Sequence, residues 1–145
     1  FAHRLNDLCP FEVREARQGD LLKANLALVA PGGFHMVLRW AGAGYQVHLS
    51  ESPPIHHQRP AVDVLFDSAV KTGTAPHTVA ILLTGMGSDG AVGLLNLRRA
   101  GARTAAQNEE TCVGFGMPKE AINLGAAEQG LPLDQMAGFV SKQFA

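Results

Sequence analysis

Three glycines within six residues separate an apolar run from an amphipathic segment, and this junction constrains the fold more than any other feature. The run before it, Thr78 to Leu83, is rich in branched residues, which is typical of a strand buried on both faces of a parallel sheet. The segment after it, Ala91 to Ala100, carries leucines on one face and is followed by Gly101, as an amphipathic helix often is. The loop Thr84–Gly90 is therefore predicted to join a buried strand to a helix.

The rest of the chain predicts more strands and helices in alternation. Expected helices cover residues 1–8, a segment opened by Pro60, residues 91–100, residues 119–124 and a last segment capped by Asp134. Expected strands cover residues 11–15, 26–30, 35–40, 45–49, 78–83 and 102–106. The strands at 35–40 and 45–49 flank a glycine-containing loop, which indicates an antiparallel hairpin. The order predicts an α/β fold, open and doubly wound, with a mostly parallel sheet and a peripheral antiparallel hairpin.

Composition limits the classes of function. The 145 residues fit one domain, and a net charge of -1 argues against a nucleic-acid binder that works by bulk charge. No apolar run approaches the roughly 18 residues of a membrane span, and no secretory signal is visible. Cys9 and Cys112 are isolated, without metal-ligand spacing, and predict reduced thiols in a cytoplasmic protein.

The glycine loop supports a first hypothesis, dinucleotide binding. Gly85, Gly87 and Gly90 match the spacing G-x-G-x-x-G after a strand, and the acidic residues Glu109 and Glu110 follow about twenty positions later. A carboxylate inside the loop, that of Asp89, opposes this hypothesis because it would repel a pyrophosphate.

Asp89 supports two other interpretations. A carboxylate at the end of a buried strand can orient the histidine of a Ser-His-Asp hydrolase. Alternatively, Asp89 merely caps the helix that follows it, as aspartate commonly does. The residues alone leave both interpretations open.

Several blocks, in order and at fixed spacing, carry a family resemblance. They are Thr84-Gly85-Met86-Gly87-Ser88-Asp89-Gly90, Phe115-Gly116-Met117-Pro118-Lys119-Glu120-Ala121, and the upstream segments 30–36 and 59–66. With them the chain resembles the catalytic domain of the chemotaxis protein-glutamate methylesterases, the CheB family, from Phe1 almost to its end. The resemblance implies a serine hydrolase that removes methyl groups from glutamate methyl esters on the cytoplasmic signalling helices of chemoreceptors, with possible deamidation of glutamines.

The resemblance also implies roles for single residues. Asp89 matches the triad aspartate, and Met86, flanked by Gly85 and Gly87, matches a residue whose backbone N–H helps to form the oxyanion hole. No metal or organic cofactor is implied. Ser88 fails the G-x-S-x-G pattern of a nucleophile. His35 is expected to be structural or substrate-facing, and His56 and His57 to be solvated, so no catalytic histidine is assigned.

The family's nucleophilic serine and catalytic histidine belong to segments that would precede Phe1. We therefore expect residues 1–145 to be the larger, C-terminal part of a single catalytic domain whose first strands are missing, and to be inactive alone. A receiver domain of the response-regulator type is a possible N-terminal partner. A non-catalytic receptor-binding relative is a further alternative. Two departures, Gln58 for a histidine and Ala61 for a serine, lie before the helix at Pro60, and Ala61 removes a side-chain cap worth about 1 kcal/mol.

Overall fold

The computed structural model describes residues 1–144. Its α-helices are α1 (Ala2–Leu8), α2 (Val62–Lys71), α3 (Ala91–Arg99), α4 (Met117–Asn123) and α5 (Leu133–Gln143). Its strands are β1 (Glu12–Glu15), β2 (Leu26–Val29), β3 (His35–Trp40), β4 (Tyr45–Ser50), β5 (Val79–Leu82), β6 (Arg103–Gln107) and β7 (Gln129–Leu131). Two short 3-10 helices, η1 (Ala75–His77) and η2 (Glu109–Thr111), precede β5 and follow β6.

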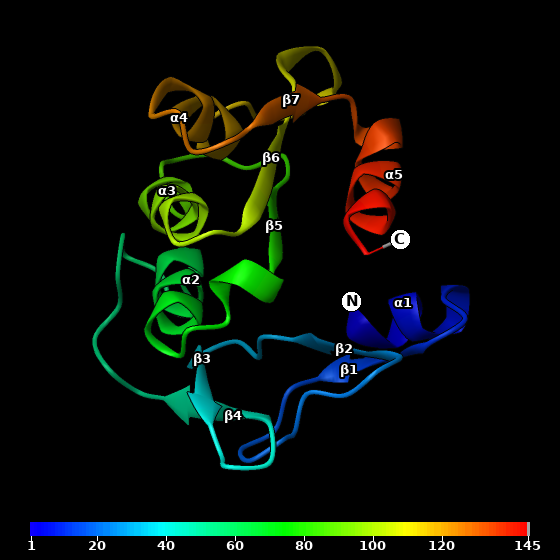
Figure 1. Ribbon diagram of the computed structural model, residues 1–145, viewed down its shortest axis with the longest axis vertical. Coiled ribbons are helices and arrows are strands. Elements are labelled where there is room, and N and C mark those ends of the chain that lie inside the picture. Colours follow the sequence, from blue (N-terminus) through cyan, green and yellow to red (C-terminus); the bar gives the residue numbers. More distant parts are fainter. Residues whose placement is uncertain (145) are drawn as a thin grey trace.

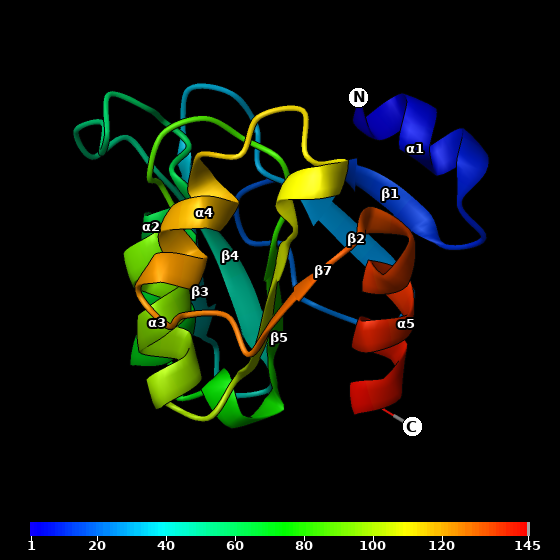
Figure 2. The ribbon, with the colours of Figure 1, turned by 90° about the horizontal axis from the view of Figure 1, so that it is seen from above.

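The second half of the chain forms a three-layered unit. Strands β5, β6 and β7 pair in parallel in that order, with Leu82 opposite Ala106. Helices α3 and α4 cover one face of this sheet and α5 covers the other, while α2 packs against α3 (Figures 1 and 2). The predicted α/β fold with a parallel sheet and helices on both faces is confirmed.

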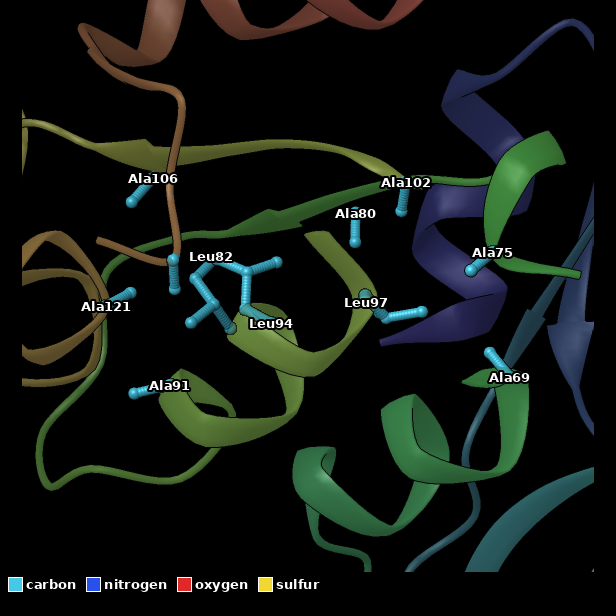
Figure 3. Packing of buried hydrophobic residues seen from close by; sticks show 11 residues of the cluster. Ala69, Ala75, Ala80, Leu82, Ala91, Leu94, Leu97, Ala102, Ala106 and Ala121 are labelled. Atoms are coloured by element: carbon cyan, nitrogen blue, oxygen red, sulfur yellow. The ribbon is translucent and has the colours of Figure 1, made fainter. Parts of the chain in front are cut away.

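The main core lies between this sheet and the helices α2, α3 and α4. Leu94 and Leu97 of α3 are fully buried in this core, and Leu94 lies beside Leu82 of β5 (Figure 3). Much of the remaining lining is alanine, including Ala106 on β6 and Ala121 on α4. Small side chains let the helices approach the sheet closely, and each fully buried leucine contributes roughly 1.5–3 kcal/mol.

The first half of the chain supplies two more strand pairs. Strands β1 and β2 pair in parallel, and β3 and β4 form the predicted antiparallel hairpin. The hairpin is less peripheral than expected, because β3 packs on α2 and its Leu38 N–H donates to Ser68 Oγ at 2.9 Å. Met36 and Val47 of the hairpin form a second small core with Ala16.

Several predicted boundaries were wrong. Helix α2 begins at Val62, after Pro60, and α4 begins at Met117 instead of Lys119. Helix α5 has Pro132 at its N-cap, so Asp134 lies in the first turn and does not cap it. Strand β7 was not predicted, since its Gln-Gly-Leu sequence carries no strand pattern. No helix within residues 1–144 has the length and apolar character needed to cross a bilayer.

Candidate active site

Asp89 lies in the loop between β5 and α3, at the carboxyl end of the parallel sheet, where open α/β proteins collect their ligands. Its side chain is 1% exposed. Asp89 Oδ2 accepts a hydrogen bond from the Val62 N–H at 2.7 Å, and Oδ1 accepts one from the Asp63 N–H at 3.0 Å. Asp89 therefore caps α2, and the alternative that it caps the helix following it, α3, was wrong.

This contact also explains how α2 tolerates alanine at its N-cap. Ala61 makes no side-chain cap hydrogen bond, and the carboxylate of Asp89 serves the first N–H groups of α2 in its place. The partial positive charge of a helix N-terminus favours an ionised carboxylate there. The loss of a cap expected from the sequence is thus offset by a residue 28 positions away, which no local pattern indicates.

A second carboxylate, that of Asp63, lies beside the first. Asp63 Oδ1 accepts a hydrogen bond from the Gly93 N–H of α3 at 2.8 Å, and Oδ2 lies 2.8 Å from His56 Nε2. The His56 side chain is 40% exposed, in agreement with the predicted solvated position, but its imidazole also bonds to Asp63, which the sequence did not indicate. The sequence missed Asp63 altogether, and its place in the first turn of α2 was the only available signal.

Donor atoms of His56, Asp63 and Asp89 lie within 4.8 Å of one another, a set of ligand types that a divalent cation accepts. The Asp89 carboxylate already accepts two backbone N–H groups at the N-terminus of α2, and the Asp63 carboxylate accepts one in the first turn of α3. That end of a helix repels a cation. We therefore treat the group as a hydrogen-bonded network and assign no metal to it.

Hydrogen bonds fix the glycine loop against the loop that follows β6. The Gly85 N–H donates to the Gly114 carbonyl at 2.9 Å, and the Gly85 carbonyl accepts from Met117 N–H at 2.9 Å. Thr84 Oγ1 accepts from the N–H groups of Val113 and Gly114 at 3.0 and 2.8 Å. The two loops therefore form one rigid edge at the end of the sheet.

Met86 lies on the outer side of this edge. Its side chain is 73% exposed, and that of Val113 on the adjoining loop is 99% exposed. Among residues 1–144, no acceptor takes a hydrogen bond from the Met86 backbone N–H. A rigid loop that leaves an N–H free can stabilise an oxyanion, because such a donor needs no reorganisation when charge develops.

The dinucleotide hypothesis gains no support from this geometry. Both the N–H and the carbonyl of Gly85 already form hydrogen bonds with the neighbouring loop, so the N–H is not available to a phosphate. Glu109 and Glu110 are exposed in η2. The buried carboxylate of Asp89 occupies the loop at the point where a pyrophosphate would need positive charge.

The surroundings of two further residues, His35 and Cys112, argue against a catalytic role for either. His35 is 1% exposed, accepts the Ala61 N–H at Nδ1 and donates from Nε2 to the Pro53 carbonyl, at 3.2 and 3.0 Å. These contacts make His35 a structural link, one of the two roles predicted for it. Burial raises the pKa of the Cys112 thiol, which disfavours the nucleophilic thiolate.

The fold and the loop define a class: an open α/β protein with a buried loop carboxylate and a free backbone N–H at the carboxyl edge of a parallel sheet. Within that class the chain belongs to the CheB methylesterase family, whose profile matches residues 1–140. The resemblance seen in the sequence is thereby confirmed.

Similar proteins agree with this assignment. The chain is 50% identical over 137 residues to the protein-glutamate methylesterase/protein-glutamine glutaminase 2 of Syntrophus aciditrophicus (strain SB), covering 94% of this chain and 40% of that protein. It is 49% identical to the protein-glutamate methylesterase/protein-glutamine glutaminase of Bdellovibrio bacteriovorus, covering 99% of this chain and 40% of that protein. The chain thus spans about two fifths of the length of these curated relatives.

A solved structure shows the same architecture. The CheB methylesterase catalytic domain of Thermotoga maritima superposes with a TM-score of 0.89 at 37% sequence identity. The match covers 93% of this chain and 71% of that one.

Proposed function

We propose that this chain contributes the aspartate and the oxyanion loop of a protein-glutamate methylesterase that acts on chemoreceptor signalling helices. The observation that carries the proposal is the buried Asp89 carboxylate, fixed by two N–H groups of α2 in the same loop as the free Met86 N–H. The names of the relatives, which include both methylesterase and glutaminase, support ester hydrolysis together with glutamine deamidation.

The remaining triad members come, in this proposal, from residues that precede Phe1. The serine hydroxyl attacks the ester carbonyl while the histidine takes its proton, and the histidine then protonates the departing methanol. Water activated by the same histidine hydrolyses the acyl-enzyme and regenerates a glutamate. Asp89 orients the imidazole and stabilises its protonated form, and the Met86 N–H, flanked by Gly85 and Gly87, stabilises the oxyanion.

The proposal includes where the protein works and what it contacts. Its substrates are methylated cytoplasmic helices of chemoreceptors, so the protein acts in the cytoplasm. A receiver domain on the N-terminal side is its proposed regulatory partner. Residues 1–145 alone are expected to release no methanol, because a triad without its serine and histidine retains only a small residual rate.

Asp89→Asn in the complete gene product tests the assignment. We expect methanol release from methylated receptor to fall roughly 10⁴-fold, because an asparagine holds the wrong histidine tautomer. The amide also turns a donor toward the α2 N–H groups, so the variant should lose about 1–3 kcal/mol of stability. Activity is therefore compared at a temperature where denaturation curves show the variant fully folded.

Ser68→Ala is the matched control. It deprives the half-buried Leu38 N–H of its acceptor at a cost of about 1–3 kcal/mol, away from the loop. It should keep near-normal activity per folded molecule. Near-normal activity of Asp89→Asn would show that Asp89 is not the triad aspartate, whereas a complete gene product without any methanol release would indicate a non-catalytic, receptor-binding relative.

A further inference from the structure

We propose that His56 is a positioning residue for Asp89 that acts through Asp63. The inference rests on the proposed catalytic role of Asp89 and adds to it a side chain from the loop before α2. It assigns a role to the His56 imidazole, which neither the triad nor the oxyanion loop uses.

Two hydrogen bonds connect His56 to Asp89 through Asp63, and a third holds Asp63 to α3. His56 Nε2 lies 2.8 Å from Asp63 Oδ2, the other oxygen of Asp63 accepts the Gly93 N–H of α3, and the Asp63 N–H donates to Asp89 Oδ1. Asp63 is thus at once the partner of His56 and one of the two donors that aim the Asp89 carboxylate. A displacement of Asp63 would therefore disturb one of the two hydrogen bonds that orient Asp89.

The backbone at His56 points to the same conclusion. His56 and His57 have φ angles of 53° and 60°, and the N–H and carbonyl groups of Ile55 and Gln58 bond to each other across them at 3.0 and 2.9 Å. A two-residue turn with positive φ at both central positions favours Asn-Gly or Asp-Gly, not two histidines. Strained backbone of this kind tends to occur at functional sites. Here it directs one imidazole onto Asp63.

The charges of two neighbouring carboxylates explain what the His56 imidazole contributes. Asp63 and Asp89 place two carboxylates close together behind the same helix turn, and both are almost wholly buried. Like charges at this separation repel, and His56 supplies a side-chain donor that offsets the repulsion on Asp63. Without it, Oδ2 of Asp63 loses its partner, and we expect the first turn of α2 to shift relative to Asp89.

His56→Ala in the complete gene product tests the inference. A displacement of about 1 Å near the reacting groups can lower a rate roughly 100-fold, so we expect kcat to fall about 10- to 100-fold with KM nearly unchanged. His57→Ala is the matched control, since it removes an imidazole from the same turn at nearly the same φ and should leave kcat unchanged. His56→Gln should restore most of kcat, because the glutamine Nε2 reaches about as far as the imidazole Nε2 and still offers a donor to Asp63.

An activity-independent measurement separates this inference from the proposed role of Asp89. In ¹H–¹⁵N spectra, the Val62 and Asp63 amide resonances, whose protons bond to Asp89, should shift in His56→Ala and stay in place in His57→Ala. If Asp89→Asn abolishes activity while His56→Ala matches His57→Ala in kcat and in these shifts, the positioning role is wrong and the catalytic role of Asp89 stands. If Asp89→Asn remains active, the proposed function fails, and unshifted amides would then overturn the His56–Asp89 connection as well.

Discussion

At the scale of single residues, two glycines of the Thr84–Gly90 loop illustrate how neighbouring side chains decide whether a position tolerates a larger residue. Gly87 and Gly90 have nearly the same φ, 86° and 90°. A Cβ on Gly87 would meet nothing within 4 Å, whereas a Cβ on Gly90 would lie 2.8 Å from Leu82 Cδ2 and 2.9 Å from Val62 Cγ1. A side chain at position 90 is therefore disfavoured for two reasons, the left-handed backbone angle and the Leu82 and Val62 side chains that lie against Gly90.

We expect Gly90→Ala to lower the free energy of unfolding by about 2–4 kcal/mol, from a strained left-handed backbone and an overpacked contact. Gly87→Ala, which meets only the backbone strain, should cost about 1–2 kcal/mol. Urea denaturation of both variants measures the difference. Equal losses would mean that the side chains of Leu82 and Val62 move aside easily enough to admit a methyl group.

At the scale of elements, the close contact of α2 with α3 connects the active-site loop to the core. Gly93 of α3 faces α2, where an added Cβ would lie 2.8 Å from Asp63 Oδ1 and 2.8 Å from Phe66 Cβ. The same Gly93 donates its N–H to Asp63. Glycine in a helix interior normally lowers helix stability, but at this position the close approach of α2 leaves no space for a side chain.

Gly93→Ala is expected to destabilise the protein by about 1–3 kcal/mol, because overpacking exceeds the gain in helix propensity. Gly138 of α5 has open space around its Cβ position and serves as the comparison. Gly138→Ala should stabilise by about 0.5–1 kcal/mol. Thermal unfolding of the two variants should show a lower Tm for Gly93→Ala and a higher Tm for Gly138→Ala. A higher Tm for Gly93→Ala would contradict the tight α2–α3 contact.

At the scale of the whole molecule, the segment after β1 attaches the β1–β2 pair to the hairpin by backbone hydrogen bonds, and the half-buried carboxylate of Asp20 fixes this segment to β1. Asp20 accepts two hydrogen bonds from Arg14 and one from the Arg17 N–H, and its own carbonyl accepts the Val47 N–H of β4. The Arg14 guanidinium and the Arg17 N–H lower the pKa of Asp20 from 3.8 to about 2. Elsewhere, burial raises the pKa of Glu128, but its bonds to Arg103 and the Thr104 N–H outweigh burial and leave that pKa below its ordinary value.

The lowered pKa of Asp20 predicts an acid-dependent contribution to stability. The folded protein holds the ionised form more tightly than the unfolded chain, so the contribution is complete above pH 3.8 and is lost as pH falls through about 2. Asp20→Asn should therefore be less stable than the wild type near neutral pH, and the difference should narrow on acidification. Urea midpoints measured between about pH 5 and pH 2 test this narrowing.

Glu12→Gln is the control for Asp20, since Glu12 lies 3.7 Å from Arg14 and its side chain is 52% exposed. An exposed pair of this kind contributes little, so its unfolding free energy should follow the wild type at every pH. A constant gap between wild type and Asp20→Asn across the acid range would show that the carboxylate acts only as a neutral acceptor.

The sequence by itself determined the α/β class, most strands and helices, the family, and the loop that carries Asp89 and Met86. These features follow from local periodicity, from glycine and proline positions, and from motif residues close together in the chain. Only the tertiary structure decided that Asp89 caps α2 instead of α3, that β7 extends the parallel sheet, and that Asp63 and His56 join the site. Each of these depends on contacts between distant segments, and hydrogen bonds of that range leave no pattern in the neighbouring residues.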